Sequence, residues 1–117
     1  CVGQVGSGIQ QGMGIALCEE IKIDPKTGRT LITNFKNYEV ANAVDVPDYQ
    51  ALFIEEGDEY GPFGAKSIGE VVVVPVPPAL VAAVNNALGT RLTHLPLTPS
   101  VILEAIERQQ EEKSHDH

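Results

Sequence analysis

The stretch from Gly61 to Glu70 holds the residue that is best suited to acid–base chemistry in this sequence. Three glycines and a proline favour an irregular backbone path, and the stretch ends in a carboxylate that is followed by four valines. A glutamate that enters apolar surroundings resists ionisation, which raises its pKa toward the range of a useful general base. A salt bridge with Lys66 and a solvated loop acid are the alternatives. The pattern makes Glu70 a candidate general base.

A second candidate site is the glycine-rich stretch from Gly6 to Gly14. Glycines allow a backbone to approach a ligand or another segment closely, and a helix N-terminus favours anions. A dinucleotide-binding fingerprint is excluded because Gln11 occupies its third glycine position, and no Lys-Ser or Lys-Thr pair completes a phosphate-binding loop. Ligand approach and tight helix packing remain as the two interpretations.

Other kinds of catalytic or metal site find little support in the sequence. His94 is the only histidine outside the polar tail, and no His-x-x-x-His pair or serine nucleophile motif occurs. The two cysteines, Cys1 and Cys18, have no CxxC spacing that would suggest zinc or an iron–sulfur cluster. We therefore expect no residue of this chain to be a direct metal ligand.

Composition limits the classes of partner. The 117 residues are 43% hydrophobic and carry a net charge of −8. They have neither the basic patch of a nucleic-acid-binding protein nor the polybasic segment of a membrane-binding one. No apolar run reaches transmembrane length and no signal peptide is visible, so we expect a cytoplasmic location. The sequence begins at Cys1 without an initiator Met and reads as the middle of a longer protein.

The elements that must position these sites follow from the residue pattern. Ser7 is a plausible N-cap for a helix whose buried face has three-to-four spacing. Two short alternating runs flank a turn at Asp24–Gly28, which is typical of a β-hairpin. The remaining expected elements are a strand over 50–55, a strand or extended segment over 71–74, a helix over 78–88 and a helix from 98–99 onward.

The expected fold class is therefore α+β, with about three helices and a small antiparallel sheet. No linker or internal repeat divides the sequence, so residues 1–117 are expected to form a single segment, and the polar residues 110–117 a frayed tail.

Both candidate stretches resemble one known family. Gly3-Gln4-Val5, followed by glycines and by Glu19-Glu20, looks like the Gly-Gln segment of the molybdenum subunit of xanthine dehydrogenase/aldehyde oxidase-type hydroxylases. The stretch from Gly64 to Glu70 resembles the Lys-x-x-Gly-Glu loop of that subunit. The resemblance extends over nearly the whole chain, and it implies a fragment from the C-terminal part of the molybdenum-cofactor-binding domain.

The resemblance also implies a role for each matching residue. Glu70 matches the catalytic base that accepts a proton during hydroxylation of an electron-poor carbon, and Gln4 matches a glutamine that hydrogen-bonds the pterin. The backbone of the preceding loop, Lys66, Ser67, Ile68 and Gly69, is implied to pack beside the molybdenum and its dithiolene. These roles are implied by the resemblance; composition and spacing indicate only that Glu70 is a candidate base.

The implied enzyme is an oxidoreductase that uses molybdopterin, with iron–sulfur clusters and FAD on other domains or subunits. Its substrate is implied to be an N-heterocycle such as a purine, or an aldehyde. We expect partners in the upstream part of the molybdenum subunit and in the iron–sulfur and FAD subunits, with self-association possible. Because 117 residues are too few for the complete site, the chain alone is expected to be inactive. A folded remnant that binds no cofactor and an acidic interaction module are the alternative functions.

Overall fold

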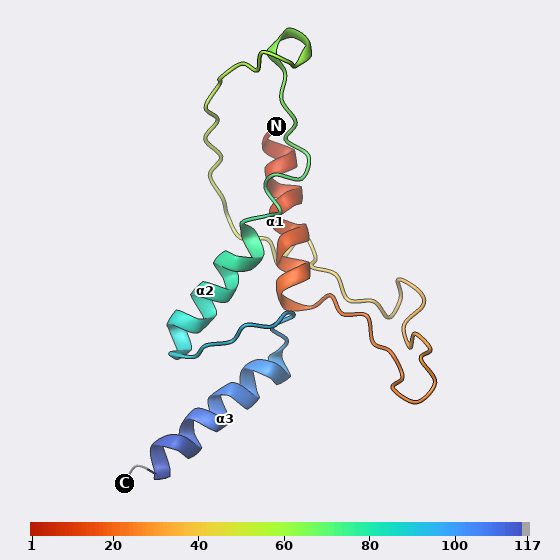
Figure 1. The fold of residues 1–117 in the computed structure, drawn as a ribbon, viewed down its shortest axis with the longest axis vertical. Coiled ribbons are helices and arrows are strands. Elements are labelled where there is room, and N and C mark those ends of the chain that lie inside the picture. The colour runs from red at the N-terminus through yellow and green to blue at the C-terminus, as the bar shows by residue number, and fades with distance from the viewer. Residues whose placement is uncertain (116–117) are drawn as a thin grey trace.

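Three helices and long irregular connections make up the computed structural model, which describes residues 1–115. Helix α1 spans Val2–Leu17, α2 spans Val76–Leu88 and α3 spans Pro99–His115, and a short 3-10 turn, η1, spans Pro62–Gly64. Figure 1 shows α1 near the middle, α2 leaving its side, and the chain between η1 and α2 returning past its N-terminal end. None of the described helices is both long enough and apolar enough to cross a membrane.

Helix α1 begins earlier than the sequence pattern predicts. The Ser7 N-cap is wrong, because the amides of Gln4 and Val5 already bond the carbonyl of Cys1 at 3.0 and 3.1 Å. The helix includes five glycines, which are poor helix formers on their own. Three of them, Gly8, Gly12 and Gly14, are buried, so packing against other segments offsets their low propensity.

The end of α1 lies against the segment that leads into α3. The amide of Leu97 donates to the carbonyl of Ala16 at 2.6 Å, which satisfies one of the carbonyls left without a partner in the last turn of a helix. Ala16 is fully buried and the Leu97 side chain is 1% exposed. This junction is the only place among the described residues where hydrophobic side chains are fully buried.

The predicted boundaries of α2 and α3 are largely confirmed. Proline occupies the first turn of α2, and Gly89 ends the helix in the left-handed conformation with φ of 67°. The side chain of Asn85 then ties down the following loop, because its Oδ1 accepts from the amide of Leu92 at 2.8 Å. Helix α3 starts at Pro99 and continues through residues 110–115; residues 116–117 of the expected tail lie outside the described residues.

The predicted antiparallel sheet is wrong, and with it the α+β class: no strand is present in residues 1–115. The turn of the expected hairpin does form, with Gly28 donating to the Asp24 carbonyl at 2.8 Å, but pairing ends at a single bridge between Ile23 and Thr30. An isolated hairpin is marginal unless further strands or a helix cover it. Ile21 and Leu31 remain 69% and 63% exposed, so nothing in the described residues covers this one.

Candidate functional site

Glu70 lies in the irregular segment that leads into α2. The amide of Val73 donates to the Glu70 carbonyl at 3.1 Å, and the amide of Val76 donates to the Val73 carbonyl at 3.3 Å. Two successive turns therefore replace the extended segment predicted over residues 71–74. Glu70 itself is exposed, so the apolar surroundings expected from its sequence neighbours are not formed by the described residues.

A long-range hydrogen bond brings two of the predicted site residues together. The side-chain Nε2 of Gln4 donates to the carbonyl oxygen of Gly69 at 2.7 Å, across 65 positions of sequence. Gln4 lies in the first turn of α1 and is half-buried. The bond attaches the first turn of the helix to the residue immediately before Glu70.

Further along α1, Gly8 and Gly12 contact the two turns that follow Glu70. A Cβ placed on Gly8 would lie 2.7 Å from the Cβ of Val72, and one placed on Gly12 would lie 2.5 Å from the Cβ of Val76. Atoms this close would overlap, so only glycine permits the observed approach. The tight-packing interpretation of the glycine cluster therefore describes these two contacts. The Gly12 contact is with the first residue of α2, on which α1 packs, and the Gly8 contact is with the turn before α2.

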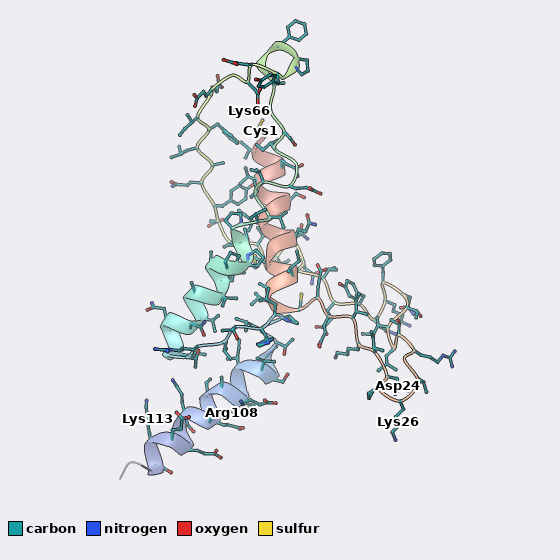
Figure 2. All side chains as sticks on the ribbon, viewed as in Figure 1. Cys1, Asp24, Lys26, Lys66, Arg108 and Lys113 are labelled. Atoms are coloured by element: carbon teal, nitrogen blue, oxygen red, sulfur yellow. The ribbon has the colours of Figure 1, made fainter. Side chains whose placement is uncertain are left out.

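The other predicted loop residues border a cleft at the N-terminal end of α1. Lys66, Ser67 and Ile68 line it together with Cys1 and the segment from Phe53 to Gly57, and its volume is about 650 Å³. Figure 2 shows Lys66 beside Cys1, at the end of α1 that also carries Gln4. Residues predicted from two distant stretches thus meet at one end of one helix.

The alternative pairing of Glu70 with Lys66 is not observed. Among the described side chains, the ion pair present joins Arg108 to Glu104 at 3.6 Å on the exposed face of α3. No hydrogen bond of the Glu70 carboxylate to another described side chain or backbone group occurs either. The carboxylate is therefore available to accept a proton from a group outside the described residues.

The loop that precedes Glu70 has the donors that a pterin would need. Within residues 1–115, the backbone N–H groups of Lys66, Ser67, Ile68 and Gly69 make no hydrogen bond to another group of the chain. Free amide donors along an irregular segment can bond the ring nitrogens and oxygens of a heterocycle. No group of three or more His, Cys, Asp or Glu side chains that could hold a metal ion occurs in the described part. The residues present thus fit the organic part of a molybdenum cofactor.

Two contacts that the sequence did not reveal hold the far side of α1. The hydroxyl of Tyr49 donates to the carbonyl of Val2 at 3.2 Å, and Gln10 Nε2 donates to the carbonyl of Ala41 at 2.6 Å. Both acceptors are backbone carbonyls, so no signal in the sequence could have found these contacts. The segment from 41 to 49 consequently runs along α1 in the opposite direction.

Electrostatic perturbation is concentrated at the other end of the helix. The hydroxyl of Tyr38 donates to Glu19 Oε2 at 2.9 Å, and this bond raises the pKa of Tyr38 above its usual range. Burial, followed by the negative charge of Glu19, raises the pKa of the Cys18 thiol. Cys18 follows the last residue of α1 and Tyr38 is bonded to Glu19, whereas Gln4 lies in the first turn of the helix, so neither group takes a direct part in the candidate site.

Comparison with known proteins identifies the family of this chain. The model of the molybdopterin cofactor-binding domain family matches residues 1–47, which include Gln4 and all of α1. The putative xanthine dehydrogenase molybdenum-binding subunit of Escherichia coli strain K12 is 37% identical over 102 residues, which are 87% of this chain and 14% of that protein. A probable xanthine dehydrogenase subunit of Bacillus subtilis strain 168 is 36% identical over 110 residues, covering 92% of this chain and 14% of the relative.

A solved structure extends the similarity to the fold. Quinoline 2-oxidoreductase from Pseudomonas putida 86 aligns with a TM-score of 0.81 at 33% identity, over 91% of this chain and 14% of that one. The chain therefore spans about a seventh of the length of these relatives. On the family model, these sequence similarities and the shared fold, the chain belongs to the molybdopterin-binding subunits of the xanthine dehydrogenase and aldehyde oxidoreductase family.

Proposed function

We propose that this chain supplies the catalytic base and part of the pterin site of a molybdenum hydroxylase, with Glu70 as the base. The observation that carries the proposal is the hydrogen bond from Gln4 to Gly69. It attaches the helix matched by the cofactor-binding family model to the residue before Glu70. An exposed carboxylate without an ion-pair partner is also the form in which a base can accept a proton.

Each candidate residue then has a defined task. The bound molybdenum cofactor supplies the two-electron oxidation, and iron–sulfur clusters and FAD on other domains or subunits carry the electrons away. The free N–H groups of Lys66, Ser67, Ile68 and Gly69 hold the pterin. The second hydrogen of the Gln4 side-chain amide and its Oε1 remain available to the same ligand, because the bond to Gly69 uses one donor. Glu70 receives the proton at its carboxylate oxygen.

An N-heterocycle such as a purine is the substrate class that we propose. The relatives named above are a xanthine dehydrogenase molybdenum-binding subunit, a probable xanthine dehydrogenase subunit and a quinoline oxidoreductase, and these names refer to N-heterocycles. An aldehyde is the second candidate, because an aldehyde oxidoreductase molybdenum-binding subunit of E. coli is 33% identical over 88% of this chain. An electron-poor carbon is common to both classes, so the same base serves either.

The proposal requires partners that complete the site. Glu70 is exposed here, whereas a general base of raised pKa needs surroundings that exclude water. We propose that the upstream part of the molybdenum subunit provides these surroundings, and that iron–sulfur and FAD subunits join it. The alternative is a folded remnant that binds no cofactor.

Substitution of Glu70 by Gln in the complete molybdenum-binding subunit, assembled with its partner subunits, tests the proposal. The amide keeps the size of the side chain but cannot accept the proton. We expect kcat to fall by on the order of a hundred- to ten-thousandfold, the usual contribution of a general base. Molybdenum and pterin content should stay unchanged, measured by metal analysis and by fluorescence of the oxidised pterin. Turnover is measured with xanthine, a quinoline and an aromatic aldehyde.

Lys66→Met is the matched control. It removes the charge next to the cleft but leaves the backbone donors of the loop in place, so it should change kcat far less than Glu70→Gln. If Glu70→Gln keeps more than about a tenth of wild-type turnover, the loss is below the smallest expected for a general base and the assignment is wrong. If the complete subunit holds no molybdenum, the remnant interpretation is correct.

A further inference from the structure

We infer that Gln4 is a positioning residue for Glu70, and that it acts by holding the peptide group between Gly69 and Glu70 in one orientation. The inference rests on the proposed function of Glu70 as the base. It goes beyond that function because it gives the first turn of α1 a task in catalysis that is separate from contact with the cofactor.

The covalent geometry of the backbone makes the hydrogen bond effective. The carbonyl oxygen of Gly69 and the amide nitrogen of Glu70 belong to the same planar peptide group. Gln4 Nε2 holds that oxygen at 2.7 Å. With the peptide plane held, the direction of the Glu70 side chain depends on its own φ and its side-chain torsions.

Steric contacts do not provide this constraint at Gly69. A Cβ placed on Gly69 would have no heavy atom within 4 Å, so no neighbouring group packs against the side-chain position of this residue. Glycine also adopts backbone conformations that other residues avoid. Among the described residues, the bond from Gln4 is therefore the contact that holds the carbonyl oxygen of the peptide leading into Glu70.

The glycine contacts of α1 hold the chain on the other side of Glu70. Val72 lies against Gly8 and Val76 against Gly12, so residues 69, 72 and 76 follow positions 4, 8 and 12 of the helix. Positions 4 to 12 of an α-helix span about 12 Å, whereas seven extended residues would reach about 23 Å. The two turns after Glu70 contract the segment to the length of the helix face. Glu70 is thus held from both sides by one rigid element.

The test is Gln4→Met in the complete, cofactor-loaded enzyme, because methionine has nearly the same length as glutamine but no donor. We expect kcat to fall on the order of ten- to hundredfold, since small misplacement of a catalytic group has losses of this size. KM should change less than twofold and molybdenum content should stay at the wild-type level. Gln11→Met is the matched control: the same substitution on an exposed position of α1, expected to leave kcat, KM and molybdenum content unchanged.

A double-mutant cycle with Glu70→Gln separates positioning from other roles. If Gln4 acts through Glu70, Gln4→Met should cause little further loss of turnover in the Glu70→Gln background. A loss of the same factor in both backgrounds would overturn the inference. So would a loss of molybdenum in proportion to activity, because Gln4 would then act by retaining the cofactor.

Amide hydrogen exchange provides a readout that does not depend on turnover. The Val73 amide is bonded to the Glu70 carbonyl, so its exchange should accelerate in Gln4→Met and stay at the wild-type rate in Gln11→Met. Unchanged exchange in Gln4→Met would overturn the inference even if Glu70 is the base. If Glu70→Gln retains turnover while Val73 exchange accelerates in Gln4→Met, the hydrogen bond orders the loop but the proposed function fails.

Discussion

Tyr38 and Glu19 form the clearest coupled pair of polar side chains in the described structure. Their hydrogen bond, at 2.9 Å, joins the segment that follows the Asp24–Gly28 turn to the C-terminal end of α1. It raises the pKa of Tyr38, first through the bond itself and then through removal of the hydroxyl from water. Only protonated Tyr38 can donate this bond, so its contribution to stability depends on pH.

The expected dependence is a loss of stability at high pH. The contribution is fully present below the unfolded tyrosine pKa of about 10, and it is lost as the pH rises through the higher pKa of the folded chain. Glu19→Ala should lower the pKa of Tyr38. The measurement is an NMR titration of the complete subunit carrying a 13Cζ-labelled tyrosine at position 38. An unchanged midpoint in Glu19→Ala would contradict the hydrogen bond as the cause.

At this scale the sequence revealed residue types better than their partners. Glu70 was predicted from the glycines and the carboxylate of its stretch, and the four residues before it from the family resemblance. The structure places three of those four, Lys66, Ser67 and Ile68, around one cleft. The bond between Gln4 and Gly69 could not be predicted, because it joins positions 65 residues apart and one of its partners is a backbone carbonyl. Backbone acceptors have no residue-type signature, so their contacts emerge only from the fold.

Helix α1 depends on close approach at some glycines and not at others. Gly8 and Gly12 lie against valine side chains, whereas a Cβ on Gly3 would have no heavy atom within 4 Å. The Cβ atoms of Val72 and Val76 are attached directly to the backbone, so they cannot move aside without moving the segment that carries Glu70. The positions of Gly8 and Gly12, and not the number of glycines in α1, therefore determine how closely the segment after Glu70 approaches the helix.

Gly8→Ala and Gly3→Ala should have opposite effects on stability. In Gly8→Ala the added methyl overlaps Val72, and overpacking of this kind lowers the free energy of unfolding by about 1 to 3 kcal/mol. Gly3→Ala adds a methyl in open space and should stabilise the helix by about 0.5 to 1 kcal/mol. Urea unfolding of the two variant subunits, read at α1 by hydrogen exchange, compares them. Equal effects in the two variants would mean that α1 does not pack on Val72.

The boundaries of α2 and α3 and the turn at Asp24–Gly28 followed from local patterns, whereas the start of α1 and the sheet did not. Pro in the first turn of α2, Gly89 at its end and Thr98-Pro99 before α3 are local signals, and each marks a boundary that the structure has. Strand pairing is decided by neighbours distant in sequence. The turn at Asp24–Gly28 forms because the Asp24 side chain accepts from the Lys26 amide and from the Thr27 hydroxyl. The flanking runs then have no further strand to pair with in residues 1–115.

The molecule as a whole is less compact than a typical globular protein of the same mass. Its accessible surface is 9562 Å², against about 6,200 Å² for a compact monomer of this mass. Its radius of gyration is 18.8 Å, against about 13 Å for a compact domain of 117 residues. Several large hydrophobic side chains are more than 90% exposed, among them Leu52, Ile54 and Phe63. These residues lie on the connection between α1 and α2 that passes the candidate site.

The isolated 117-residue chain should therefore associate with itself and bind an apolar dye, because exposed apolar surface of this extent favours contact with other molecules. It should also contain no stoichiometric molybdenum, since a single loop and one glutamine cannot hold a pterin tightly. Sedimentation at micromolar concentrations, dye fluorescence and metal analysis test these expectations. A monomer that binds no dye would contradict the first expectation. One molybdenum per chain would contradict the second.

The register between α1 and the Glu70 segment limits how this part of the sequence can diverge among relatives. Positions 4, 8, 12 and 16 share one face of α1 and meet Gly69, Val72, Val76 and Leu97 in turn. Inserting or deleting one residue between them would rotate every later position by about 100° and turn the glycines away from the valines. Point substitutions on the exposed positions of the helix have no such effect. Functional relatives should therefore align through α1 without gaps, while length variation collects in the connection over residues 18–48.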